Sequence, residues 1–440
     1  MRNVFSDRGR LAAMLRAEWA LAAATAEAGL TAPALAAALE RIDADMLDAG
    51  AIGAATALAG VPTIPFVAAV RRLLPPDLEP DFHKGATTQD ILDTALALQM
   101  REAFGALVDD LTATLAALAA LARRHRADVC AGRTYGQHAA PVTFGAKVGL
   151  WGAGLADVAA RMETTRTRAC VAALGGPTGL STQFGPHAAR VGAAFARHLG
   201  LATAPFVWHA LRGRMAETGF FLAELVGALA KMATDIAHLA STEVSEVAEP
   251  YVSGRGGSSA MPHKRNPVSC VAVLAAHAVA GSHVATLLDA MAVLHERGIG
   301  QWHAEWLALP PLFGLASGAL REARALAEGL VVDTRRMRDN LEATRGLVFS
   351  DAAAAALSRH IGADAAHRAI EEAAAETRAT GRHLRDVVRA RPDCASASIA
   401  AEIDAAFDPA DAIGHGAAVA DRAADAIEAA ALSLRTRSDR

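Results

Sequence analysis

The strongest constraint on the fold is a set of long runs in which apolar residues recur every three or four positions. The clearest run has apolar side chains at Leu222, Leu225, Leu229, Met232, Ile236 and Leu239. A second run has them at Phe104, Val108, Leu111, Leu115, Leu118 and Ala122. Because this spacing places side chains on one face of an α-helix, both runs predict long amphipathic helices. Comparable apolar stretches follow Pro267 and Pro311. The chain is therefore expected to be all-α, with a bundle of unusually long helices.

Composition narrows the class of protein further. With 440 residues, the chain is too long for one ordinary core. Hydrophobic residues make up 52% and charged residues 20%, yet no run of about 18 apolar residues appears, so no membrane partner is expected. The formal net charge of -4 is spread along the chain without a basic stripe, which argues against a nucleic-acid partner. Helices that extend beyond the apolar core of their own chain generally bury the remaining apolar surface against other subunits. We therefore expect a homo-oligomer.

Cysteine usage and the N-terminal segment bear on the compartment. Cys130, Cys170, Cys270 and Cys394 lie far apart and form no CxxC pair, which fits a reducing environment. The segment Met1–Arg10 is polar and carries charges of both signs, so it does not resemble a secretion signal. We expect a cytoplasmic protein.

Glycine- and proline-rich stretches at 59–65, 175–186 and 253–267 interrupt the helical pattern and predict loops. Between the first two of them, residues 83–90 read HKGATTQD and precede a predicted helix starting near Ile91. Thr87 and Thr88 would place hydroxyls beside free backbone N–H groups, a combination that binds anions. The alternative, a Thr/Asp helix cap without a ligand, stays open.

A second polar segment, residues 132–141, reads GRTYGQHAAP. Arg133 can grip a carboxylate through two parallel hydrogen bonds, and Gln137 can recognise a neutral oxygen. The alternative is an ordinary turn between helices, closed by Pro141 at a helix start.

The third segment, residues 254–267, concentrates chemistry within a glycine-rich stretch bounded by prolines. It contains two adjacent serines, Ser258 and Ser259, followed by Lys264 and Asn266. The lysine and the amide could fix a substrate carboxylate beside a serine. A generic phosphate loop is the alternative, but the spacing GxxxxGK[ST] is absent.

Residues 257–267 read GSSAMPHKRNP and resemble the signature GSSxMPxKxNP of the fumarase/aspartase superfamily at every fixed position. The other two segments resemble the superfamily's remaining active-site regions in order and spacing. The resemblance implies three helical domains at 1–85, 86–345 and 346–440, with the loop 254–267 in the central long-helix bundle. It also implies a homotetramer whose active sites are shared between subunits.

The same resemblance implies roles for individual residues. Ser258 matches the loop serine that exchanges a proton on the carbon next to a substrate carboxylate, and we place Ser259 beside it in the binding set. Lys264 and Asn266 match the residues that bind this carboxylate, while Thr87 and Thr88 match carboxylate-binding hydroxyls. The developing negative charge would be stabilised by the lysine and the threonines.

One departure from the superfamily pattern is informative. The second region typically reads RTH, and its histidine pairs with a glutamate seven positions after the signature lysine. This chain has Tyr135 and Val271 at those positions, so both halves of the usual general acid are missing. An amine or hydroxide leaves poorly without a proton, whereas a carboxylate leaves or attacks without that help. The departure therefore favours a reaction that forms or opens a lactone.

Residues 5–10, 59–65 and 295–306 resemble the bacterial cycloisomerase branch of the superfamily, whose members act on a carboxylated muconate in aromatic catabolism. This branch implies that one carboxylate of a small tricarboxylate adds to a double bond of the same molecule. A C–N or C–O lyase resembling adenylosuccinate lyase and an inactive structural or binding homologue are the alternatives.

A tricarboxylate needs several cationic contacts, for which Lys264, Arg133 and Arg297 are candidates, although a solvated structural role for Arg297 remains open. His138 could replace the missing histidine, with a structural role as the alternative. His295, His303 and Glu305 match no metal-binding spacing and the reaction requires no metal, so we expect neither a metal nor a cofactor.

Overall fold

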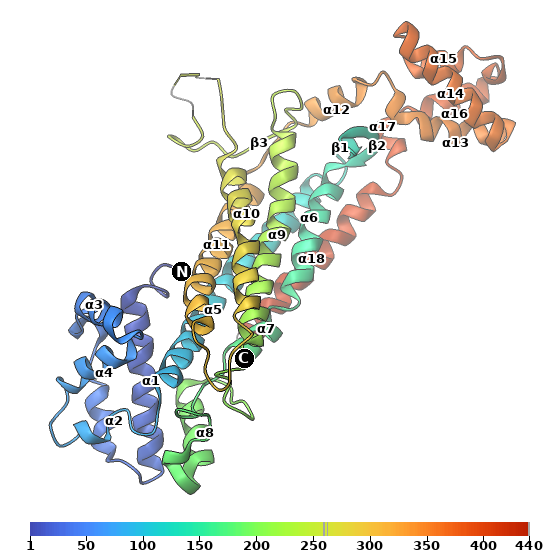
Figure 1. Ribbon diagram of the computed structural model, residues 1–440. Coiled ribbons are helices and arrows are strands. Elements are labelled where there is room, and N and C mark those ends of the chain that lie inside the picture. Colours follow the sequence, from blue (N-terminus) through green and yellow to red (C-terminus); the bar gives the residue numbers. More distant parts are fainter. Residues whose placement is uncertain (258–259, 262, 439–440) are drawn as a thin grey trace.

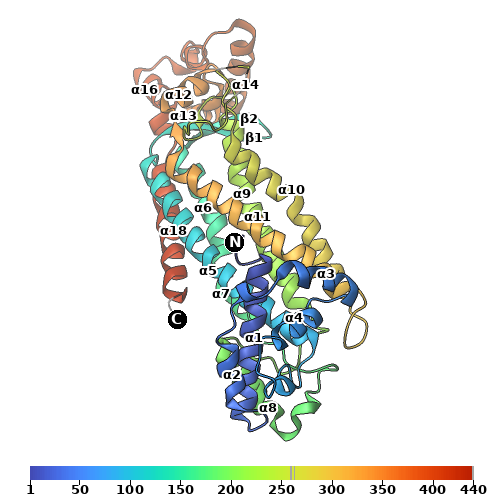
Figure 2. The same ribbon diagram turned by 90° about the vertical axis from the view of Figure 1, so that its left-hand side faces the viewer.

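The computed structural model describes residues 1–257, 260–261 and 263–438. Helix accounts for 69% of the structure, and the few strands among the described residues form two small antiparallel sheets. The expectation of an all-α protein is thus confirmed as a mostly helical fold. The molecule is elongated, with a long helical bundle between two groups of shorter helices (Figures 1 and 2).

Long helices that lie along one another form the bundle. They are α5 (Thr88–Arg124), α6 (Phe144–Ala159), α9 (Gly213–Leu239), α10 (Val268–Asp289), α11 (Gln301–Gly329) and α18 (Gly416–Ser438). Every residue of the two predicted apolar seams is buried, one seam in α9 and the other in α5. The helix predicted after Pro311 begins earlier, because Pro310 and Pro311 both lie inside α11.

Shorter helices gather at the end of the bundle where α5 begins. They are α1 (Asp7–Glu27), α2 (Pro33–Leu39), η1 (Ala44–Met46), α3 (Ala49–Ala59), α4 (Thr63–Arg71), η2 (Glu79–Asp81), α7 (Met162–Ala169), η3 (Thr182–His187) and α8 (Ala188–Leu199). Helix α1 packs against α8 and α5, and one continuous apolar core joins these helices to the bundle. This end therefore forms a rigid base for the start of α5.

The opposite end carries a second group of helices with its own apolar core. They are α12 (Thr334–Glu342), η4 (Leu347–Phe349), α13 (Ser350–Ile361), α14 (Ala363–Thr380), α15 (Leu384–Arg389), η5 (Pro392–Cys394), α16 (Ala397–Ala406) and α17 (Pro409–Ala412). Helix α18 leaves this group and packs on α5 and α6. Ala424 and Ile427 of α18 lie in the apolar core of the bundle.

The two sheets lie near that second group of helices. Strands β1 (Val129–Thr134) and β2 (Gln137–Thr143) form a hairpin, and β3 (Val247–Ala248) pairs with β4 (Val331–Val332). The alternative interpretation of residues 132–141, a turn closed by Pro141 at a helix start, is wrong, because Pro141 lies in β2 opposite Ala131. Helix α6 begins at Phe144 instead.

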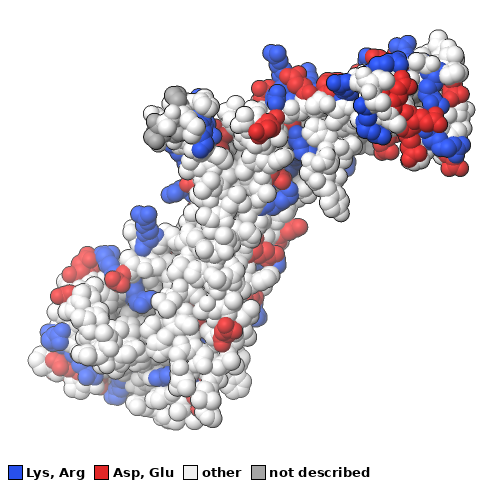
Figure 3. All heavy atoms as spheres, turned by 45° about the horizontal axis from the view of Figure 1, so that its top comes forward, with Lys and Arg blue, Asp and Glu red and all other residues white. Residues whose placement is uncertain are grey.

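Two bundle helices, α5 and α10, are long and apolar enough to cross a membrane by length and composition alone. More than half of the apolar window of α5 is buried inside the protein, as expected for a central bundle helix. Only 22% of the corresponding window of α10 is buried, so much of its apolar surface is uncovered within one chain. One face of the bundle carries few charges, which are concentrated toward the two ends (Figure 3).

Candidate functional site

The start of α5 brings together three residues that the sequence assigns to substrate binding. Thr87 is the N-cap, and its backbone N–H donates to the Asp90 carboxylate over 2.9 Å. Thr88 is the first helical residue. Arg297, from the segment between α10 and α11, donates from Nη2 to Thr87 Oγ1 over 3.0 Å. The predicted helix cap is therefore present, and it is combined with a cation from far along the chain.

Buried contacts hold this helix start in place. Asp90 is fully buried and accepts the backbone N–H groups of Gly175 and Gly176 over 2.8 and 2.9 Å. Its carboxylate thus joins the helix start to the loop at 175–186. With Asp90 occupied in this way, the half-buried hydroxyls of Thr87 and Thr88 and the guanidinium of Arg297 are the groups suited to receive an anion.

One turn further along α5, a buried ion cluster ties three bundle helices together. Arg212 at the start of α9 donates to Asp93 of α5 over 2.7 Å and to Glu305 of α11 over 2.8 Å. Trp302 adds an N–H bond of 3.0 Å to Asp93. Burial raises the pKa of Glu305, although Arg212 counteracts this rise. Burial alone would lower the pKa of Arg212, but the two carboxylates raise it overall, so the guanidinium stays charged.

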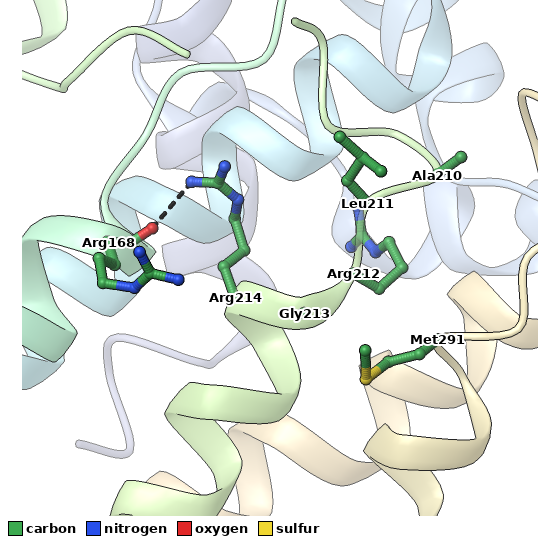
Figure 4. Close-up of a pocket in the computed structure, with 7 residues that line it drawn as sticks. All are labelled: Arg168, Ala210, Leu211, Arg212, Gly213, Arg214 and Met291. Atoms are coloured by element: carbon green, nitrogen blue, oxygen red, sulfur yellow. Dashed lines mark hydrogen bonds between the residues drawn. The ribbon is translucent and has the colours of Figure 1, made fainter. Parts of the chain in front are cut away.

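A pocket of about 420 Å³ lies beside this cluster (Figure 4). It is lined by Arg168, Ala210, Leu211, Arg212, Gly213, Arg214 and Met291. Arg214 donates to the backbone carbonyl of Arg168 over 2.8 Å, the contact dashed in Figure 4. The pocket's lining includes none of the residues that the sequence assigned to substrate binding.

The hairpin at the other end of the bundle carries the second predicted region. Its turn consists of Tyr135 and Gly136, both with positive φ, as a two-residue hairpin turn of this kind requires. Tyr135 is fully exposed at the tip, and Gln137 is also exposed. His138 is half-buried; burial lowers its pKa, and the nearby Arg133 lowers it further.

Arg133 has a different environment from the one that the sequence suggested. Its guanidinium makes two parallel hydrogen bonds to the fully buried Glu246, at 3.1 Å and 2.5 Å. Asn340 of α12 donates to the same carboxylate over 2.8 Å. Because this fork already grips a carboxylate within the chain, the geometry favours a positioning role for Arg133 over direct substrate binding.

The signature loop lies at the same end as the hairpin, between α9 and α10. Lys264 is exposed, and its backbone N–H donates to Met261 O over 3.0 Å. Asn266 is half-buried, and its backbone N–H donates to Gly256 O over 2.8 Å. Ser258 and Ser259, the predicted catalytic serine and its neighbour, lie outside the described residues.

The predicted site residues therefore form two groups at opposite ends of the bundle. Thr87, Thr88 and Arg297 lie where α5 begins, near α1 and α4, whereas the hairpin follows the end of α5 (Figures 1 and 2). Helix α5 has 37 residues, so at about 1.5 Å per residue the two groups are on the order of 55 Å apart. One chain does not bring them together.

Sequence reasoning missed several buried polar contacts around these groups. His83 Nδ1 lies 2.5 Å from Oε1 of the buried Glu18, close to the start of α5. The Arg212 cluster and the Glu246 partner of Arg133 were also missed. A charged residue inside an apolar helical pattern, such as Glu18 or Asp93, was the available signal, because charges are seldom buried without a partner. Among the described residues, no group of three potential metal ligands is found.

Comparison with known proteins agrees with the mostly helical fold. The sequence profile described as lyase matches residues 1–281, and the profile described as adenylosuccinate lyase C-terminus matches residues 346–423. The chain therefore belongs to the lyase family of the fumarase/aspartase superfamily.

Within that family the chain resembles cycloisomerases over almost its whole length. It is 43% identical to a 3-carboxy-cis,cis-muconate cycloisomerase of Pseudomonas aeruginosa, over 96% of this chain and 93% of that protein. The crystal structure of a 3-carboxy-cis,cis-muconate lactonizing enzyme from Pseudomonas putida superposes with a TM-score of 0.92 and 38% identity, covering 98% and 97% of the two chains. A nitrosuccinate lyase of Streptomyces davaonensis is 40% identical over 95% of this chain and 90% of that protein.

Proposed function

We propose that this protein is a 3-carboxy-cis,cis-muconate cycloisomerase. In the proposed reaction, one carboxylate of the substrate adds to a double bond of the same molecule and forms a lactone, and the carbon next to a second carboxylate gains a proton. The full-length similarity to enzymes with this name supports the assignment.

The observation that carries the proposal is the paired replacement of the superfamily's general acid. Tyr135 lies at the tip of the hairpin with its ring in solvent, and Val271 is exposed on the first turn of α10. Neither side chain transfers a proton in the way that a histidine–glutamate pair does. An attacking carboxylate does not need such a proton, because its pKa is near 4. The missing acid therefore fits lactone formation.

In this mechanism, the two ends of the bundle contribute different chemistry. From the loop end, Lys264 and Asn266 hold the carboxylate next to the protonated carbon, and Ser258 supplies the proton while Ser259 contacts the substrate. From the α5 end, Thr87, Thr88 and Arg297 bind another carboxylate of the substrate. Gln137, which lies on the hairpin at the loop end, remains a candidate for binding a neutral oxygen. The main contribution of Lys264 is to stabilise the negative charge that develops on the carboxylate next to the protonated carbon.

We further propose a homotetramer in which different subunits supply the two ends. The separation of the two groups along α5 supports this assembly, because a small tricarboxylate cannot span about 55 Å. Exposed apolar side chains on the bundle also support it, including Phe220 of α9, Val279 and Leu288 of α10, and Leu307 of α11. Exposed apolar residues on neighbouring bundle helices are typical of a subunit interface. The free, buried cysteines fit a cytoplasmic location.

Similarity to nitrosuccinate lyase supports a second candidate function. Breaking the C–N bond of a nitrosuccinate releases nitrite, a stable anion that leaves without a general acid. The missing histidine–glutamate pair therefore fits this reaction as well as lactone formation. What distinguishes the two is the substrate, which is a conjugated tricarboxylate in one case and a saturated dicarboxylate in the other.

Purified protein offered 3-carboxy-cis,cis-muconate, nitrosuccinate and adenylosuccinate in separate assays will decide between these functions. We expect loss of the conjugated muconate absorbance and appearance of a lactone. Nitrite release with the muconate unchanged would establish the second candidate instead. Turnover of adenylosuccinate alone would contradict both.

A further inference from the structure

The signature loop has two stems, residues 255–257 on its N-terminal side and residues 265–269 on its C-terminal side. Both stems meet at one buried carboxylate, Glu322 of α11. From the N-terminal stem, Arg255 donates through Nη2 to Glu322 Oε2. From the C-terminal stem, Ser269 donates through Oγ to the same oxygen over 2.9 Å. Arg255 Nη2 also donates to Ser269 Oγ over 2.9 Å, so the three side chains close a triangle. A single atom thus fixes both stems to the bundle.

Backbone contacts bring the same stems together. Asn266 N–H donates to Gly256 O over 2.8 Å, and Gly257 pairs with Arg265 as an isolated antiparallel bridge. Gly256 has a φ of 72°, and a Cβ atom there would lie 2.7 Å from Asn266 O. Only glycine fits this approach. The stem geometry is therefore specified on the backbone side as well as on the side-chain side.

A second carboxylate fixes the start of α10 directly after the loop. Glu249 accepts the backbone N–H of Ser269 over 3.0 Å and that of Cys270 over 2.9 Å. These are N–H groups that a helix start leaves without a partner in the helix itself. Glu249 therefore holds the helix, while Glu322 holds both stems against α11.

Glu322 is well placed to remain ionised. Its side chain is only 10% exposed, compared with 35% for Arg255. Burial alone would raise the pKa of Glu322, but the hydrogen bonds from Arg255 and Ser269 lower it overall. A charge-assisted hydrogen bond at a mostly buried position is stronger than a neutral one.

We propose that Glu322 is a positioning residue for the reaction: by holding Arg255 and Ser269 on one oxygen atom, it sets the stem spacing that presents the signature loop to the substrate. Glu322 acts through the loop and does not contact the substrate. The proposal rests on the proposed function only in assigning catalysis to the loop.

The variant Glu322→Gln tests the proposal because glutamine keeps the size of the side chain and removes its charge. We expect kcat to fall by about tenfold or more, since small displacements of catalytic groups are costly, while the oligomer size and the circular dichroism spectrum stay unchanged. Glu328→Gln is the matched control: Glu328 lies on the same helix and also pairs with an arginine, Arg324, over 2.7 Å. Its kcat should equal that of the wild type.

A double-mutant cycle separates positioning from general structural damage. If Glu322 acts by presenting the loop serine, then Glu322→Gln should have little further effect in a Ser258→Ala background. Equal losses of kcat in the two backgrounds would contradict the proposal. Arg255→Lys should retain more activity than Arg255→Met, because lysine keeps the charge.

Hydrogen exchange provides a readout that needs no substrate. The Asn266 amide, which bridges the stems, should lose protection in Glu322→Gln and keep it in Glu328→Gln. Unchanged protection in Glu322→Gln would overturn the inference even if the enzyme's reaction were different. Inactivity of the wild type on the muconate, with protection lost as expected, would count against the proposed function and leave the inference standing.

Discussion

The two ends of the bundle differ in how they hold their polar groups. At the α5 end, Asp90, Asp93 and Arg212 are buried and hydrogen-bonded to neighbouring helices and loops, so the helix start that we propose to bind an anion is held in place within one chain. At the loop end, Lys264 and the tip of the hairpin are exposed. One end thus holds its polar groups in a fixed arrangement within the chain, whereas the other presents them outward, as the proposed sharing of sites between subunits requires.

The largest expected effect lies at the loop end. Replacing Ser258 with alanine should reduce turnover by about 10²- to 10⁴-fold, the usual contribution of a placed proton donor. The free energy of unfolding and the oligomer size should stay unchanged. Steady-state kinetics, together with thermal unfolding, will check both parts. Near-normal turnover would remove Ser258 from its role.

The α5 end should respond in stability as well as in activity. Arg212→Met leaves Asp93 and Glu305 buried without their cation, which should lower the free energy of unfolding by about 3–5 kcal/mol. Chemical denaturation will measure this loss. As a control, Arg168→Met breaks the exposed pair with Glu217 and should cost about 1 kcal/mol or less. Equal losses of unfolding free energy in the two variants would show that the buried cluster stabilises the fold no more than an exposed ion pair does.

Replacing the two arginines that the sequence assigned to substrate binding, Arg297 and Arg133, should have different effects. Arg297→Met should lower kcat/KM by about tenfold or more, because it removes a charged contact worth roughly 1.5–3 kcal/mol. Its melting temperature should change little. Arg133→Met should instead lower the melting temperature, since it leaves the buried Glu246 carboxylate without its guanidinium. A stable Arg133→Met variant with a raised KM would return Arg133 to the binding set.

The smallest expected effect is a pH dependence of stability at the α5 end. Burial alone would lower the pKa of His83, but the neighbouring Glu18 carboxylate raises it by more. The folded-state pKa therefore lies above the unfolded value of about 6.5. The pair therefore stabilises the fold fully below that value, and this stabilisation is lost as the pH rises through the folded-state pKa. Melting temperatures at several pH values should show the loss in the wild type but not in His83→Gln.

Local sequence patterns predicted the helices better than the site. The seams of α5 and α9 were predictable because burial of one helical face follows directly from residue spacing. The hairpin at 129–143 was missed because Pro141 looked like a helix start, and proline is also tolerated on a strand at the edge of a sheet. The partnership of Arg133 with Glu246 joins residues 113 apart, which no local pattern encodes.

The site itself was predictable as a set of segments and not as an arrangement. Motif resemblance identified the three segments and their order along the chain. In the folded chain, Thr87 and Lys264 lie at opposite ends of the bundle. Thr87 precedes α5 and Lys264 precedes α10, and these two helices start from opposite ends of the bundle. The proposed sharing of sites depends on contacts between chains, and one chain shows only the surface that would make them, such as the exposed Leu307.

The most direct test of the central claim, that each site combines the α5 end of one subunit with the loop end of another, is complementation between variants that are impaired at opposite ends. Arg297→Met and Ser258→Ala chains, unfolded together and refolded as mixed oligomers, should regain activity, up to about a quarter of the wild type when each end is drawn at random from two equally abundant chains. Ser258→Ala mixed with Lys264→Met is the control, because both defects lie in the same loop, and it should stay inactive. Failure of the first mixture to exceed its parents, despite proven mixing of the subunits, would contradict the claim.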